Sequence, residues 1–221
     1  MIRLYQFAWS PYCLVLRGIL DACGCRYESV DVSQADRSVI WRLTKERYYQ
    51  VPVLKDGRNV LFETGPDSQV LAKYLDDRLG LGLFPPEWEG VQALVWRYFE
   101  NDVEDVAFRL NDIHWREFVP KGEHCGFVRH KERRYGRGCL DLWRTQEAAL
   151  LDSLNRVLQI PEGMLATRPF LLTDRPLFAD FCLRGMIANY LYSGHYTMSA
   201  ALPLLSGWMD RMSRVRLPYR A

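Results

Sequence analysis

The chain has 221 residues, 48% of them hydrophobic and 25% charged, which is typical of a protein that buries a sizeable core in one large or two small domains. Its 29 basic and 27 acidic residues leave a formal net charge of +2, so no overall field favours nucleic acid or an anionic membrane surface. Six cysteines are too sparse for a disulfide scaffold, so we expect free thiols. Because charges interrupt every apolar run and no leader pattern opens the chain, we expect no membrane insertion and a cytoplasmic location.

Short strands and helices alternate at the beginning of the chain. Residues 2–7 combine Ile, Leu, Tyr and Phe without a turn former, which predicts a short buried strand. Ser10 and Pro11 then predict the start of a helix, because serine is a favoured cap and proline is tolerated at the first helical position. A strand at 26–30 and a helix within 33–49 complete a βαβα unit.

A hairpin and a further helix close this unit. Two apolar runs, 51–54 and 59–62, flank Asp56-Gly57, which is a strong hairpin signal. Residues 66–68 then open an amphipathic helix, so the element order becomes βαβαββα.

The periodicity changes after a Gly- and Pro-rich stretch. We predict an α/β domain at 1–80, a linker at 81–87 and an all-helical domain at 88–221. The expected helical segments of the second domain are 88–116, 127–157, 176–192 and 200–213, with breaks at Pro120, Pro161 and Pro203.

Four motifs in this order resemble those of the glutathione S-transferase family. They are Ser10-Pro11-Tyr12-Cys13, which is similar to the glutaredoxin Cys-Pro-Tyr-Cys turn with serine first, Val51-Pro52, the run Asp67–Leu75, and Arg168–Leu172 followed by Phe178-Ala179-Asp180. The resemblance implies a thioredoxin-like N-terminal domain and an all-α C-terminal bundle. Residues 112–140 have no counterpart in it.

Ser10 is the catalytic residue that the resemblance implies. A free thiol has a pKa near ~8.5, so glutathione needs a group that stabilises its thiolate. A serine hydroxyl at a helix N-terminus can donate a hydrogen bond to the sulfur, and the helix dipole favours the negative charge. Two alternatives stay open: Ser10 is only a helix cap, or Cys13 is the active centre.

Three consecutive residues are expected to bind the middle and the glycine end of glutathione. Pro52 resembles the family's cis-proline, which leaves the main chain of Val51 free to pair with the cysteinyl part as an added strand would. Gln50 stands where the family often has a polar side chain that reaches the glycine carboxylate.

Asp67 and Ser68 are expected to bind the γ-glutamyl end of glutathione through an acidic side chain, a hydroxyl and a helix N-terminus. Residues 63–66 are an insertion before them, so Glu63-Thr64 is an alternative acidic-hydroxyl pair. We prefer Asp67-Ser68 because Tyr74 follows at the family's spacing.

Other positions carry simpler interpretations. Leu177 replaces the family's Ser or Thr before Asp180, so the capping box of that helix is incomplete. The basic run 128–137 is interpreted as a solvated helix face. No metal site is expected, because His124, Cys125, His130 and Cys139 lack zinc-site spacing.

The sequence therefore predicts an enzyme that activates glutathione, its co-substrate, for attack on a small, fairly apolar electrophile. The resemblance implies a homodimer, and no nucleic acid, membrane or metal is expected as a partner. Two alternatives remain: a non-catalytic interaction protein of the same fold, or a glutathione-dependent thiol oxidoreductase that uses Cys13.

Overall fold

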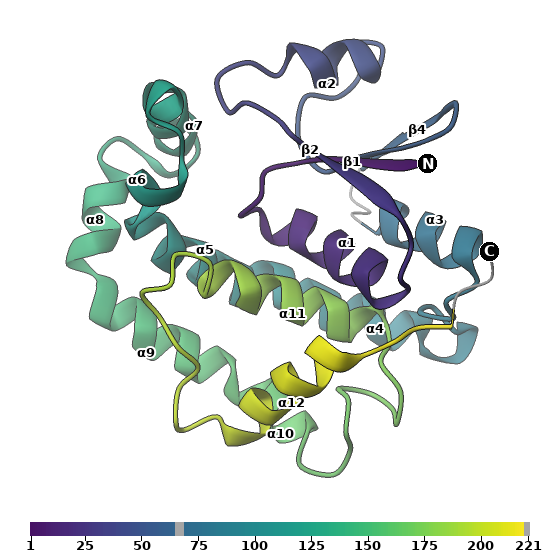
Figure 1. Ribbon diagram of the computed structural model, residues 1–221. Helices are drawn as coiled ribbons and strands as arrows, with labels where there is room; N and C mark the ends of the chain where they lie inside the picture. Colours follow the sequence, from purple (N-terminus) through teal and green to yellow (C-terminus); the bar gives the residue numbers. More distant parts are fainter. Residues whose placement is uncertain (65–68, 219–221) are drawn as a thin grey trace.

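The computed structural model describes residues 1–64 and 69–218. Its first part is built on a four-stranded sheet of order β2-β1-β3-β4. The strands are β1 (Ile2–Gln6), β2 (Tyr27–Asp31), β3 (Val53–Asp56) and β4 (Asn59–Phe62). β1 and β2 are parallel, whereas β3 is antiparallel to both of its neighbours. Helices α1 (Pro11–Ala22) and α3 (Val70–Leu79) lie on one side of the sheet and α2 (Ser38–Leu43) on the other (Figure 1).

The predicted βαβαββα order and thioredoxin-like architecture are confirmed. Asp56 pairs with Asn59 at the end of the β3–β4 hairpin. Gly57 stands between them with a φ of 58°, a left-handed conformation that glycine adopts without strain. A small core between the sheet and α2 contains Val53, Phe62 and Ile40.

The second part is helical, and its helices are more numerous and shorter than the sequence predicts. They are α4 (Pro86–Tyr98), the π-helical η1 (Phe99–Val103), α5 (Glu104–Ile113), α6 (Trp115–Phe118), the 3₁₀ turn η2 (Lys121–Glu123), α7 (His124–Tyr135), α8 (Cys139–Thr145), α9 (Glu147–Val157), α10 (Gln159–Met164), α11 (Phe178–Tyr190) and α12 (Pro203–Arg214). The predicted helical segment 127–157 is helical, but it is divided among α7, α8 and α9. Gly136 and Gly138 have φ values of 94° and 74°, and they separate α7 from α8.

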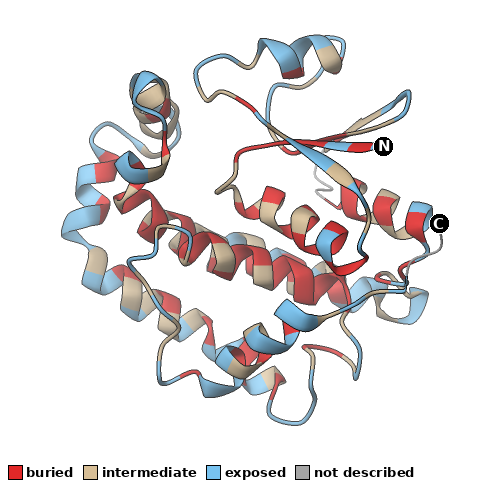
Figure 2. Ribbon diagram, viewed as in Figure 1, coloured by how far each residue is buried: buried red, intermediate tan, exposed pale blue. Residues whose placement is uncertain are grey.

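Helix α11 runs through the middle of the molecule and packs against α1, which joins the two parts (Figures 1 and 2). Gly185 permits this contact. A Cβ atom there would lie 2.4 Å from Cγ2 of Val15 and 2.9 Å from the carbonyl oxygen of Pro11. One core of buried side chains extends from α1 and α3 through α11 to α12. None of the helices in the described part of the chain is long and apolar enough to cross a membrane.

Candidate functional site

Ser10 lies in the turn between β1 and α1, where the sequence places it. Its backbone is extended, and its carbonyl oxygen accepts the N–H of Leu14 at 2.9 Å, the first bond of the helix. Within the described residues its side chain makes no capping hydrogen bond. The hydroxyl of the half-buried Ser10 is therefore not used to cap α1. It forms a hydrogen bond with the Cys13 thiol, so donating its proton to a ligand at the helix N-terminus means exchanging this partner for the ligand.

The turn before Ser10 is fixed by contacts to the helical part. Asn189 Nδ2 of α11 donates a 2.7 Å hydrogen bond to the carbonyl oxygen of Trp9. The Trp9 ring stacks on Phe7 with centroids 5.6 Å apart and contacts Phe118 at 5.3 Å. Both parts of the molecule thus set the position of the Ser10 hydroxyl.

Cys13 is fully buried, and its thiol contacts the turn before α1 from the inside. This burial raises the pKa of the thiol to about 12, outweighing the lowering by hydrogen bonds to the Ser10 side chain and the Phe7 backbone. Since the thiolate is the reactive form of cysteine, a buried thiol with a raised pKa is a poor nucleophile. This geometry weighs against Cys13 as the active centre.

The Val51–Pro52 peptide bond is cis, as the resemblance leads one to expect. The β3 ladder begins with Val53, opposite Tyr5 and Phe62, so Val51 lies just beyond the paired strands. Gln50 and Val51 line both of the cavities described below. The main chain of Val51 can therefore accept an extended ligand along its edge.

Glu63 holds the beginning of α3. Its carboxylate accepts the backbone N–H of Val70 at 3.1 Å and of Leu71 at 3.4 Å, and its side chain also lines the larger cavity. Asp67 and Ser68, the residues preferred for the γ-glutamyl end, lie outside the described residues. Among those described, the acidic group between α3 and the cavity is Glu63, the alternative that the sequence left open.

Two adjoining cavities lie between the sheet-containing part and the helical part, and both are lined by Tyr12, Gln50, Val51 and Arg134. The larger, of about 240 Å³, has an apolar floor formed by Val15, Leu16, Ala72, Trp96 and Phe178. The smaller, of about 120 Å³, begins at Ser10 and Pro11 and has the aromatic walls Phe7, Trp9, Phe108, Phe127 and Tyr135. Ser10 and Val51, the two residues predicted to bind the cysteinyl part of glutathione, thus line one cavity.

Carboxylates from the helical part border these cavities, and the sequence did not single them out. The Tyr12 hydroxyl donates a 2.9 Å hydrogen bond to Glu100 Oε1, and burial raises the pKa of Tyr12 strongly. Glu104 lines the smaller cavity, and burial raises its pKa to about 7 against the opposing charges of Lys131 and Arg134. Glu100 and Glu104 are four residues apart, a spacing that places two side chains on one helix face. This spacing is the sequence feature from which their proximity could be predicted.

Helix α7 contributes basic groups to the smaller cavity, so the interpretation of run 128–137 as a solvated face is wrong for part of it. Lys131 forms a 2.5 Å ion pair with the buried Asp112 and lies 4.5 Å from the Phe108 ring centroid. Burial and neighbouring cations lower the pKa of His130 to about 4. Both side chains, with Arg134, line the cavity. Glu123, next to α7, accepts the backbone N–H of Gln34 at 2.6 Å and ties this region to the first part.

Asp180 organises the other end of α11. Its carboxylate accepts the backbone N–H of Leu177 at 2.9 Å, which is one half of a capping box, and a leucine side chain cannot supply the other half. The same carboxylate accepts the Leu171 N–H and the Trp208 Nε1–H, each at 3.0 Å. Despite these bonds, burial raises its pKa to about 6. Asp180 lines neither cavity, and its contacts give it a structural role.

Comparisons with known proteins agree on one family. The model of the glutathione S-transferase N-terminal domain matches residues 4–81, and the model of the glutathione S-transferase C-terminal domain matches residues 142–215. Glutathione S-transferase 4 of Zea mays is 25% identical over 215 residues, which cover 96% of this chain and 87% of that protein.

Solved structures share the fold. A glutathione transferase from Phanerochaete chrysosporium superposes with a TM-score of 0.82 at 18% identity, covering 97% of both chains. A glutathione S-transferase from Ceriporiopsis subvermispora, solved in complex with glutathione, gives a TM-score of 0.77 at 19% identity, with 96% of this chain and 94% of that one covered. At these identities the structures support the fold alone.

Proposed function

We propose that this chain, which belongs to the glutathione S-transferase family and is a glutathione S-transferase-like enzyme, binds glutathione along Val51 and stabilises its thiolate with the Ser10 hydroxyl. One observation carries the proposal. Ser10, whose hydroxyl does not cap its own helix, borders the same cavity as Val51. Val51 precedes the cis peptide bond to Pro52.

The chemistry at Ser10 is stabilisation of an anion. The hydroxyl donates to the sulfur, and the sulfur lies at the positive end of the 12-residue helix α1. Lowering the thiol pKa by one unit takes about 1.4 kcal/mol. A hydrogen bond to a charged group contributes about 1.5–3 kcal/mol, which is enough for one to two units.

The rest of glutathione extends from Ser10 towards α3. Its cysteinyl main chain pairs with Val51, its glycine carboxylate reaches Gln50, and its γ-glutamyl ammonium is attracted by an acidic side chain near the start of α3. Glu63 supports this assignment because its carboxylate already lies at that helix end and borders the cavity. Ser68 stays the predicted partner of the γ-glutamyl carboxylate, and Asp67 stays the predicted acidic partner of the ammonium, with Glu63 as the alternative.

The electrophile occupies the remainder of the cavities. Aromatic walls such as Trp9 and Phe108 fit a small, fairly apolar body. Arg37, Lys131 and Arg134 line the same cavity, so a substrate with an anionic or strongly electron-withdrawing substituent fits it better than a purely hydrocarbon one. The transfer forms a carbon–sulfur bond from the thiolate, and the leaving group departs with the electron pair of the broken bond.

We further propose a cytoplasmic homodimer. Val91 and Leu94 of α4 are 41% and 71% exposed, and two apolar side chains three residues apart on one helix form a candidate contact for a second copy. A glutathione-dependent oxidoreductase at Cys13 is less well supported, because that thiol is buried and its pKa is raised.

Glutathione binding and conjugation of an aromatic halide, measured on the wild type and on Ser10→Ala and Cys13→Ala variants, test this function. We expect wild-type and Cys13→Ala proteins to bind and conjugate, and Ser10→Ala to bind but to conjugate at least about tenfold more slowly, the rate effect of one pKa unit. Absence of glutathione binding would refute both enzymatic functions. Activity lost only in Cys13→Ala would move the chemistry to the cysteine.

A further inference from the structure

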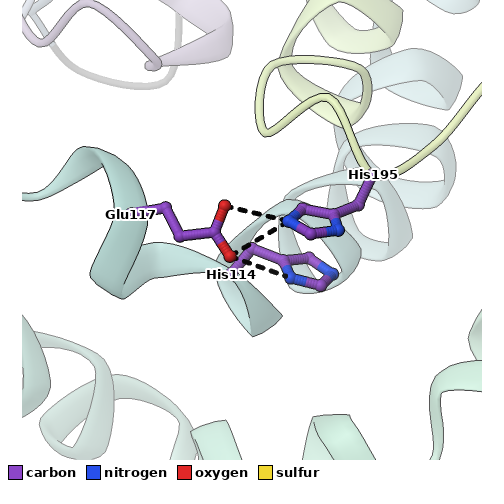
Figure 3. Close-up of side chains that lie close together, drawn as sticks. All are labelled: His114, Glu117 and His195. Atoms are coloured by element: carbon purple, nitrogen blue, oxygen red, sulfur yellow. Dashed lines mark hydrogen bonds and ion pairs between the residues drawn. The ribbon is translucent and has the colours of Figure 1, made fainter.

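We propose that His114, Glu117 and His195, none of which lines either cavity, form a binding site for one divalent transition-metal ion of the Zn²⁺ class. One nitrogen of each ring and one carboxylate oxygen lie within 4.8 Å of one another. Figure 3 shows the Glu117 carboxylate facing a nitrogen of each of the two imidazole rings.

The three residues come from two parts of the chain that the fold brings together. His114 ends α5, Glu117 lies in α6, and His195 lies in the segment after α11, 78 residues beyond Glu117. The sequence predicts no metal site because the histidines and cysteines between residues 124 and 139 lack zinc-site spacing. His195 is 78 residues from Glu117 in the sequence. Only the packing of α6 beside residues 191–202 brings the two side chains together.

The distances suit a metal with imidazole and carboxylate ligands. His195 Nε2 lies 2.9 Å from Glu117 Oε2, and His114 Nδ1 lies 3.8 Å from Glu117 Oε1. A tetrahedral ion with bonds of 2.0–2.2 Å holds its ligand atoms about 3.3 Å apart, a value between these two distances. The side chains are 19%, 55% and 44% exposed for His114, Glu117 and His195, which leaves a path for an ion and room for water as a further ligand.

A second layer of contacts orients His114. The Tyr196 hydroxyl donates its proton to Glu147 Oε1 at 2.7 Å, so its oxygen is left to accept from His114 Nε2, 3.3 Å away. This arrangement assigns the ring proton to Nε2 and directs the bare Nδ1 at the carboxylate of Glu117. A lone pair that faces an anion is unfavourable unless a cation lies between them. Hydrogen bonding of the distal ring nitrogen is also how proteins orient histidine ligands of metals.

The two imidazole rings are stacked on each other. The centroids of His114 and His195 are 3.6 Å apart, with 8° between the ring planes. An ion bound by both rings has to lie in the plane of each, and the planes of stacked rings do not meet between them. Metal binding therefore requires one ring to turn, and the ring of the more exposed His195 is the one free to do so.

Calorimetric titration of the full-length protein with Zn²⁺ as the only probe, in a non-coordinating buffer, tests the site. We expect one binding event that His195→Asn and Glu117→Gln each weaken by at least about tenfold. His124→Gln removes a histidine outside the cluster and should leave binding unchanged. Cys125→Ser, which removes the exposed thiol, should also leave it unchanged.

A stability measurement distinguishes a specific site from loose adsorption. Zn²⁺ bound to the folded state raises the melting temperature, and this rise should disappear in His195→Asn. The proposal is overturned by absence of Zn²⁺ binding to the wild type, by binding that His195→Asn and Glu117→Gln leave intact, or by binding lost in Cys125→Ser.

Discussion

Replacing Glu104 by glutamine should change how the stability of the protein depends on pH. Burial raises the pKa of the Glu104 carboxyl from 4.5 to about 7. The stabilisation that comes from holding its proton is therefore fully present below pH 4.5 and is lost as the pH rises through about 7. Glutamine keeps the shape of the protonated acid and does not ionise.

The magnitude follows from the size of the shift. A difference of about 2.5 units corresponds to about 3 kcal/mol at 1.4 kcal/mol per unit. Because the half-buried side chain borders a cavity that water can enter, we expect roughly half of this amount. The Glu104→Gln variant should be more stable than the wild type by only about 0.4 kcal/mol at pH 5 and by about 1.5 kcal/mol at pH 8. The difference at pH 8 raises the melting temperature by roughly 3–6 °C for a chain of this size.

Urea unfolding at a series of pH values between 5 and 8 measures this difference. Asp77→Asn is the control, because Asp77 is exposed on α3 and is not among the charges that act on Glu104. This variant should follow the pH dependence of the wild type. A stability difference between wild type and Glu104→Gln that stays constant from pH 5 to pH 8 would refute the reasoning.

Two further predictions concern α11. Gly185→Ala should destabilise the protein by about 1–3 kcal/mol, because the added Cβ meets Val15 at 2.4 Å. Gly163→Ala is the control and should not destabilise it, because its Cβ meets no described atom within 4 Å. Equal unfolding midpoints of the two variants in urea would contradict this prediction. Asp180→Asn should cost about 1–3 kcal/mol, because an amide cannot accept all the bonds that the carboxylate accepts from Leu171, Leu177 and Trp208. The exposed Asp152→Asn is its control in thermal unfolding.

Local signals were sufficient for the sheet-containing part of the fold. Ser10-Pro11 and Asp56-Gly57 each fix a short stretch of backbone, and the structure has α1 and the β3–β4 hairpin where they predict. Periodicity alone was not sufficient for the helical part. The helical hydrophobic periodicity continues through Gly136 and Gly138, although their positive φ values separate α7 from α8. A hydrophobic pattern does not report such a change in helix direction.

Residues of the candidate site could be predicted from the sequence only where they belong to a recognisable motif. Ser10, Val51 and Pro52 belong to motifs, and they lie around connected cavities. The raised pKa of Glu104 depends on burial by residues distant in the chain. The pairing of His114 with His195 depends on how α6 packs against the segment after α11, which no local pattern encodes.

The pKa of the thiol of bound glutathione, read from thiolate absorbance over a pH titration, tests the role of Ser10 most directly. We predict a bound-thiol pKa at least about one unit below that of free glutathione in the wild type and in Cys13→Ala, and a rise of about one unit or more in Ser10→Ala, the effect of losing one hydrogen bond to a charged sulfur. The same pKa in Ser10→Ala and in the wild type would contradict the assignment of Ser10 as the residue that stabilises the thiolate.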